Sequence, residues 1–242
     1  MVAPVDTYQA DSAAFDGDYM LRGADLTGNA DPSVHCGSFW VRFLSGDGVL
    51  QKIYENSGAY YTIEKTTGNK IHIKTTAPDS TSKSDMLSTS SYTVASGWIH
   101  VCYRIGNGSG DALYINDVDD LGAFSSNNKN IDATRANHAI GSDTSGNNKL
   151  QGLLFDFVLP GNVAPILPAT ESNRRLFINR NKKPVYLGEN AEIPFGADTF
   201  IIFAHLDKGE AAANFATNAG TGGNFTVTGS LATGSTSATD YS

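Results

Sequence analysis

The sequence of 242 residues is poor in charge, and positive charge is the scarcer sign. Charged residues make up 17% of the chain, against about 25% in an average protein. Its 17 Lys+Arg and 25 Asp+Glu give a net charge of −8. A protein that binds nucleic acid neutralises phosphates with a basic patch, and the scattered Lys and Arg form none. The composition therefore predicts no nucleic-acid partner.

Cysteine and long apolar runs are equally scarce. The two cysteines, Cys36 and Cys102, are too few for a disulfide scaffold, and we expect them to be buried free thiols. No run of about 18 apolar residues is present, which excludes a membrane-spanning helix. The start of the chain, residues 1–6, has neither the basic residues nor the apolar segment of a signal peptide. We therefore expect synthesis in the cytoplasm without cleavable export and without membrane insertion.

The residues that are abundant favour β structure. Hydrophobic residues form 40% of the chain and aromatic residues 10%, which suffices for a core and excludes a disordered chain. Turn formers are plentiful, with 25 Gly, 22 Ser, 21 Thr and 19 Asn. Short apolar segments separated by such turns about every ten residues predict an all-β sandwich or barrel.

Three segments are predicted to be the strongest strands: 37–44, 98–105 and 150–160. In the first, Phe39, Val41 and Phe43 alternate with Trp40, Arg42 and Leu44, so both faces carry apolar groups and we expect a central, covered strand. In the third, Leu153, Phe155 and Phe157 are expected on one face, with Leu154, Asp156 and Val158 on the other. The polar segment 78–91 is interpreted as a loop.

We expect one domain over residues 1–242. Its core is predicted at about 14–160, followed by a proline-rich connector at 161–184 and by late strands and a tail at 185–242. One short helix is predicted near 170–179, with Thr170 as its N-cap. The basic residues at its end are interpreted as solvated, namely Arg174, Arg175, Arg180, Lys182 and Lys183.

The order of these segments resembles the concanavalin A-like jelly roll in its laminin G-like form. The residues that carry the resemblance are Phe15–Gly17, Gly37–Val41, Gly97–Val101, Ala112–Asp117, His138–Gly141 and Leu150–Phe157. One departure is Asp117, where the hairpin of the family usually has Gly. The resemblance implies a β-sandwich of two antiparallel sheets.

The C-terminal part is similar to the tails of laminin G-like proteins encoded by tailed bacteriophages, through segments 173–177, 183–188, 194–196 and 214–225. This similarity implies a non-catalytic virion structural protein of the tail or capsid surface. Other virion proteins and copies of the chain are then its partners, and residues 185–242 a docking extension. The alternative is a glycan-binding adhesion module that recognises host surface polysaccharide, and a glycan-active enzyme is the third interpretation.

The sequence does not indicate an enzyme. A retaining glycosidase needs two carboxylates about 5–5.5 Å apart, and such jelly-roll enzymes carry them along one strand. Here the glutamates are expected to be isolated or in turns, at Glu55, Glu64, Glu171, Glu189, Glu192 and Glu210. The five histidines form no H-x-x-x-H pair for zinc. We therefore predict no catalytic residue.

Two binding sites remain as hypotheses. Asp117, Asp119 and Asp120 are candidate calcium ligands, because calcium takes several oxygen ligands; the alternative is that they are turn carboxylates in solvent. No other cofactor is indicated. Tyr60 and Tyr61, with Tyr92, are candidate glycan-binding aromatics, and the alternative is packing at the sandwich edge.

Overall fold

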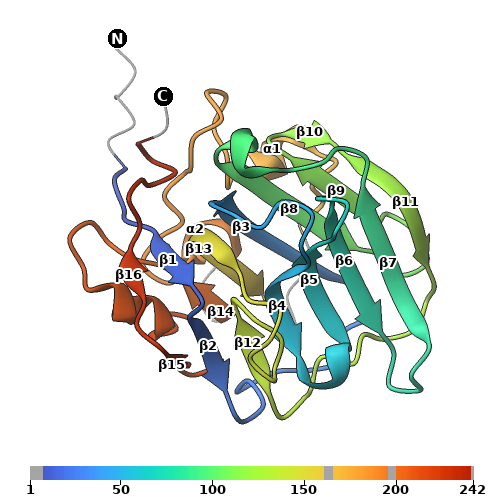
Figure 1. Cartoon of the computed structure of the whole chain (residues 1–242). Helices are drawn as coiled ribbons and strands as arrows, with labels where there is room; N and C mark the ends of the chain where they lie inside the picture. The colour runs from blue at the N-terminus through green and yellow to red at the C-terminus, as the bar shows by residue number, and fades with distance from the viewer. Residues whose placement is uncertain (1–7, 161–165, 196–199, 241–242) are drawn as a thin grey trace.

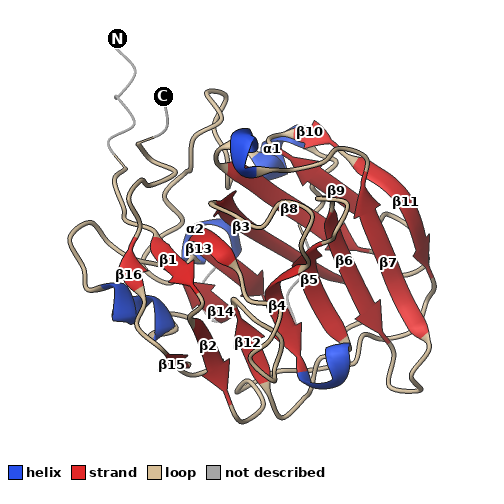
Figure 2. Ribbon diagram, viewed as in Figure 1, coloured by secondary structure: helices blue, strands red, loops and turns tan. Residues whose placement is uncertain are grey.

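The computed structural model describes residues 8–160, 166–195 and 200–240, in which antiparallel strands form two layers (Figure 1). In Figure 2 the helices are confined to short turns at the margins of these layers. Both α-helices have four residues, α1 at Glu171–Arg174 and α2 at Glu192–Phe195.

Each layer is one eight-stranded sheet. The first has the order β10 (Val118–Asp119), β9 (Ala112–Ile115), β8 (Ile99–Ile105), β3 (His35–Phe43), β13 (Gln151–Pro160), β1 (Ala13–Asp16) and β16 (Ala232–Thr233), with β14 (Phe200–Ala204) also paired to β13. The second has the order β11 (Leu121–Ser126), β7 (Ser82–Ser88), β6 (Ile71–Thr76), β5 (Tyr61–Lys65), β4 (Gln51–Asn56), β12 (His138–Ile140), β2 (Tyr19–Arg22) and β15 (Thr226–Thr228). The predicted β-sandwich of two antiparallel sheets is confirmed.

The end of the chain joins both sheets. β14 pairs with β13, β15 with β2 and β16 with β1, so strands from the two ends of the sequence lie side by side (Figure 1). Residues 200–233 therefore belong to the sandwich itself.

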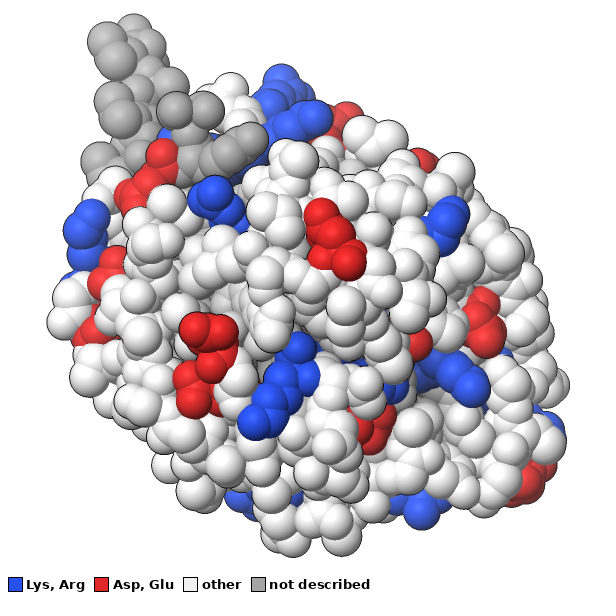
Figure 3. Space-filling model, in the orientation of Figure 1, with Lys and Arg blue, Asp and Glu red and all other residues white. Residues whose placement is uncertain are grey.

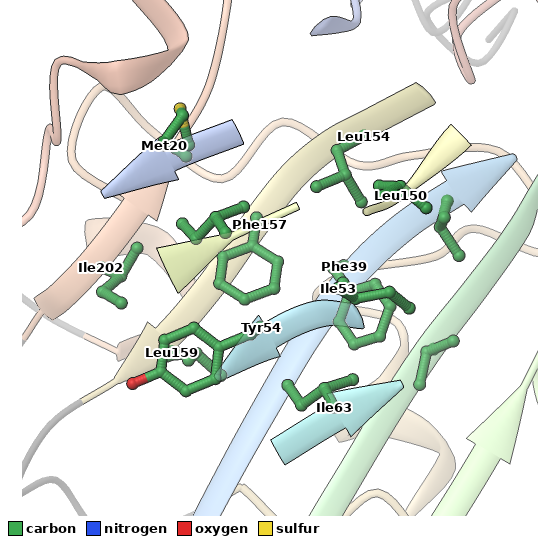
Figure 4. Packing of buried hydrophobic residues seen from close by; sticks show 14 of the residues in the cluster. Met20, Phe39, Ile53, Tyr54, Ile63, Leu150, Leu154, Phe157, Leu159 and Ile202 are labelled. Atoms are coloured by element: carbon green, nitrogen blue, oxygen red, sulfur yellow. The ribbon is translucent and has the colours of Figure 1, made fainter. Parts of the chain in front are cut away.

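The core lies between the sheets, where the period-2 pattern of β3 places its apolar side chains. Phe39, Val41 and Phe43 point inward, as predicted, whereas Trp40 packs on the opposite face. Figure 4 shows Phe39 beside Ile53 and Ile63 of the second sheet. Burying one such side chain contributes about 1.5–3 kcal/mol.

A β-bulge in β13 reverses the predicted alternation of that strand. Leu153 and Phe155 pack on the outer face, but Phe157 points into the core (Figure 4). The register of β13 against β3 shifts between Phe155 and Val158, and Asp156 has a φ of 46°. A bulge places one extra residue in its strand, so the residues after it change face. The prediction that Phe155 and Phe157 share a face is therefore wrong.

The chain after residue 166 covers the outer face of the first sheet. Ile178 packs there with Trp40 and Trp98, and Phe177 packs with Cys102 and Val158. This cover keeps both faces of the central strands dry. The predicted burial of the two cysteines as free thiols is confirmed, and burial raises the pKa of the Cys36 thiol to about 12.

The short helix predicted near 170–179 is confirmed as α1, a single turn with Thr170 at its N-cap position, but the side chain of Thr170 makes no capping hydrogen bond. The loop predicted at 78–91 is wrong, because this segment contains the strand β7, in which Met86 fills the core and the polar residues Lys83, Ser84 and Ser88 are buried as well. Among the described residues, no helix is long and apolar enough to span a membrane.

Candidate functional site

Tyr61 does not face solvent, so its prediction as a glycan-binding residue is wrong. It is 2% exposed and lies in the core between the sheets. Its hydroxyl bonds to that of Tyr103 and lies 2.9 Å from His35 Nδ1. Tyr60, the neighbouring candidate, is half-buried at the sandwich edge. The Arg135 guanidinium lies 3.6 Å from the centre of its ring and covers one face.

Tyr92 and Asp120 are brought together, but as partners of each other. The Tyr92 hydroxyl donates to Asp120 Oδ2 at 2.7 Å, and Ser90 donates to Asp120 Oδ1 through its backbone N–H at 3.0 Å and its hydroxyl at 2.9 Å. Both carboxylate oxygens are therefore used within the fold. Asp119 accepts only a backbone N–H of its own turn, from Leu121.

Asp117 is the anchor of an ion-pair cluster. Arg174 Nε lies 2.6 Å from its Oδ1, and an Arg175 nitrogen lies 2.5 Å from its Oδ2. The two arginines hold the pKa of Asp117 below its ordinary value against the effect of burial, which would raise it. The prediction that Arg174 and Arg175 are solvated is therefore wrong, since they tie the chain around α1 to the β9–β10 hairpin.

The three candidate calcium ligands thus have three separate sets of partners. Among the described residues, no group of three or more His, Cys, Asp or Glu side chains is arranged to hold a metal ion.

Two glutamates predicted to be isolated lie instead in a charged network on the outer face of the second sheet. Lys52 Nζ is 3.1 Å from Glu55 Oε2 and 2.6 Å from Glu64 Oε2. The other oxygen of Glu64 lies 2.9 Å from His72 Nδ1, and His72 Nε2 lies 2.8 Å from Asp85. Neighbouring strands carry these residues, so the prediction from the sequence is wrong.

The electrostatics of this network do not suit glycoside hydrolysis. Burial alone would raise the pKa of Glu64, but hydrogen bonds from His72 and Lys52 bring it below its ordinary value. A general acid must carry a proton near neutral pH, which requires a raised pKa. Glu64 is ionised and paired, and its site resembles a structural ion-pair chain.

The sequence did not reveal a pocket at the end of β14, which we call the histidine pocket. It has a volume of about 270 Å³. Its lining combines carboxylate, imidazole, amide and hydroxyl groups, from Glu189, His205, Asp207, Glu210, Asn214, Thr217 and Ala219.

The bulge of β13 positions the imidazole of this pocket. It directs the buried carboxylate of Asp156 outward, where its Oδ1 lies 2.6 Å from His205 Nδ1. The Tyr8 hydroxyl donates to Asp156 Oδ2 at 3.2 Å. The second ring nitrogen of His205 is 3.2 Å from Asp207 Oδ1. A non-glycine residue at positive φ in a buried strand costs free energy, and such strain is concentrated at functional sites.

Asp156 also keeps His205 charged. Burial alone would lower the pKa of His205, but the hydrogen bond and charge of Asp156, together with Asp207, raise it to about 9. Burial also raises the pKa of Asp156, although His205 and Tyr8 oppose this. We therefore assign an imidazolium in contact with a buried carboxylate at neutral pH.

An aromatic row leads from this imidazole to the surface. The ring centres of His205 and Tyr8 are 6.3 Å apart, and those of Tyr8 and Tyr186 are 5.3 Å apart. Tyr186 is 42% exposed. Its pKa is raised by burial and by the charges of Glu189, Glu192 and Asp207. Tyr8 lies between this ring and His205, which lines the pocket.

Weak signals for this pocket are visible in the sequence. Asp156 is the one charged residue in the apolar run 153–159, and His205 interrupts the apolar segment 200–206. Neither residue identifies its partner, because 49 positions separate them. Only the pairing of β13 with β14 brings them together.

Several solved structures are similar to this chain in fold. A Bacteroides ovatus protein for which carbohydrate binding is proposed matches with a TM-score of 0.65 at 12% identity, over 94% of this chain and 60% of that one. Domains LG4-5 of the mouse laminin alpha1 chain match with a TM-score of 0.47 at 9% identity, over 66% and 44%. A SAP-like pentraxin from Limulus polyphemus gives 0.45 at 12%, over 62% and 75%.

The likeness to the Bacteroides ovatus protein and the two-sheet architecture support the concanavalin A-like, laminin G-like fold that the sequence resemblance predicted. The chain spans about 60% of the length of the Bacteroides ovatus protein. No protein-family model and no curated protein matches the sequence.

Proposed function

We propose that this chain is a glycan-binding module and that the histidine pocket holds the sugar. The observation that carries the proposal is the aromatic row from His205 through Tyr8 to the exposed ring of Tyr186, next to a pocket lined by carboxylate, amide and hydroxyl groups. A sugar has an apolar C–H face that packs on an aromatic ring, and hydroxyl groups that both donate and accept hydrogen bonds. The Bacteroides ovatus neighbour, for which carbohydrate binding is proposed, supports the same class of ligand.

The polar groups of the pocket have bonding capacity left for a ligand. Asn214 Nδ2 donates to Glu210 Oε1 at 3.3 Å, which leaves the Asn214 carbonyl oxygen to accept from a sugar hydroxyl. The carboxylate of Asp207 is exposed and retains a second oxygen. These groups discriminate between sugars by the positions of their hydroxyls.

The buried pair beneath the pocket makes it rigid before a ligand arrives. Asp156 fixes the orientation of the His205 ring, and the ring in turn contacts Phe203 and Tyr8. A preformed site loses less conformational entropy on binding than a flexible one. This support favours recognition of a specific sugar over general adhesion.

A bacterial surface polysaccharide is the glycan that the sequence resemblance favours. The virion location, with other virion proteins and copies of this chain as partners, rests on the resemblance of segments 173–225 alone. Charged groups are scattered singly on the face shown in Figure 3, which favours a neutral partner there over nucleic acid. We assign no catalytic step.

Binding of the purified protein to an array of bacterial polysaccharides tests the proposal. Wild type is expected to bind a defined glycan, and Tyr186→Ala to bind it about tenfold more weakly, because one aromatic contact contributes about 0.5–1.5 kcal/mol. Tyr60→Ala is the matched control, a half-buried tyrosine already covered by Arg135. Folded wild type that binds no glycan, or equal binding by Tyr186→Ala, would refute the proposal.

The same array with a chelator tests the calcium hypothesis. Binding is expected to be unchanged, because the pocket is not a metal cluster among the described residues. Loss of binding would instead require a metal ion in the site.

A further inference from the structure

A second depression, with a polar part and a more apolar part, lies apart from the histidine pocket, at the start of β13. It consists of two adjoining hollows of about 450 Å³ and about 380 Å³ that share Gln151, and we call them together the amide groove. The first hollow lies between segments 49–51 and 146–151, and the second is bounded by β1 and β16.

Side-chain amides with free bonding capacity line this groove. The amide of Asn147 is exposed and makes no hydrogen bond within the described residues. Gln151 accepts a hydrogen bond from Ser45 through Oε1, and its Nε2 has no acceptor in the described part of the chain. Asn148 donates to Asp143 and retains its carbonyl oxygen. Both donors and acceptors are therefore available to a ligand on this surface.

The floor of the groove is held by hydrogen bonds. The buried side chain of Gln51 accepts from Gln151 N at 3.0 Å and donates to Ser45 O at 2.8 Å. The Lys65 ammonium, which is 0% exposed, donates to Gly46 O at 2.7 Å and Val49 O at 3.3 Å. The turn at one wall is thus fixed without a ligand.

The chemistry of the lining favours a neutral occupant. Its one ammonium, from Lys149, donates to Gly17 O at 2.6 Å and is already used. Its one carboxylate, Asp16, pairs in register with Gln151, so the lining carries one charge of each sign. Leu44, which is 43% exposed, adds an apolar wall that suits the C–H face of a sugar ring.

We propose that the amide groove is a second binding site and that it takes a segment of a neutral polysaccharide. The size of each hollow is in the range of about 300–1,000 Å³ that is typical of ligand sites. The inference rests on glycan binding as the function, but on residues that the histidine pocket does not share.

Titration with cello- and malto-oligosaccharides of two to six units, followed by calorimetry and amide NMR shifts, tests this site. Wild type is expected to bind the longer oligosaccharides, with shifts at residues 45–51 and 146–151. Asn147→Ala is expected to bind them about tenfold more weakly, because it loses one or two hydrogen bonds to the sugar. Asn107→Ala is the matched control, an exposed asparagine in a turn outside the groove. Oligogalacturonate is expected to bind more weakly than either neutral series.

The outcomes separate the two sites. The groove proposal is overturned, and the proposed function kept, if glycan binding is lost in Tyr186→Ala but unchanged in Asn147→Ala, and if no amide signal shifts at residues 146–151. The groove proposal is also overturned if oligogalacturonate binds more strongly than the neutral oligosaccharides. It is equally overturned if a peptide pool, but no sugar, shifts the amide signals of residues 146–151. Binding of no glycan by the folded protein overturns both.

Discussion

Replacing Asp156 by asparagine tests the electrostatics beneath the histidine pocket. Asparagine keeps the shape of the side chain and tolerates the φ of 46°, so the bulge is expected to remain. The substitution removes the charge that faces His205 Nδ1 at 2.6 Å. Asp156 is 3% exposed and His205 is 12% exposed by side chain, so solvent screens the pair little.

The magnitude follows from the pKa of His205. It rises from 6.5 to about 9 on folding, and each pKa unit corresponds to about 1.36 kcal/mol. The imidazolium therefore stabilises the fold by at most about 3 kcal/mol. Because the folded pKa lies above the unfolded value, this stabilisation is complete below pH 6.5 and is lost as the pH rises through 9.

Urea unfolding of wild type and Asp156→Asn between pH 6 and pH 10 measures the effect. At pH 6 the variant is expected to be less stable by up to about 3 kcal/mol, because the substitution also removes the cost of burying the Asp156 carboxylate. At pH 10 the difference should fall below about 1 kcal/mol or reverse, since Asp156 is then a buried carboxylate with neutral partners only. Asp207→Asn is the control, because its carboxylate is 73% exposed and such pairs contribute about 0–1 kcal/mol. An equal destabilisation by Asp156→Asn at both pH values would refute this account of the pair.

Two further substitutions test the packing. Gly141→Ala is expected to destabilise the fold by about 2–4 kcal/mol, because its Cβ would lie 2.4 Å from the buried Phe15 ring at a φ of +84°. Gly17→Ala is the control, because Gly17 has the same φ but an added Cβ would have no atom within 4 Å, so the substitution should cost only about 1–2 kcal/mol. Equal decreases in melting temperature for the two variants would contradict the clash with Phe15. Lys65→Met leaves three oxygen acceptors without their donor and should cost about 2–4 kcal/mol in urea unfolding, whereas the exposed Lys74→Met should change little. Unchanged stability in Lys65→Met would show that the buried ammonium is dispensable.

Local pattern was sufficient to predict the class of fold. The alternation of Phe39, Val41 and Phe43 predicts a buried face, because side chains of a strand point alternately to its two sides. Turn-forming residues mark where those strands end. Prediction failed where tertiary context decides, as at β7, whose polar sequence is typical of a loop although pairing with β6 makes it a largely buried strand.

The residues of the candidate site could not be predicted from the sequence. The tyrosine and aspartate candidates were chosen for their residue types, but exposure depends on neighbours distant in the chain, and Tyr61 proved to be buried.

The sequence by itself determined the β architecture, the apolar faces and the buried free thiols, all of which follow from local periodicity and residue type. Only the tertiary structure decided the bulge at Asp156, its contact with His205, and the pairing of Asp117 with the arginines near α1. The physical reason is that periodicity shows which face of a strand is apolar, but not which strand lies beside it or where one extra residue shifts the register.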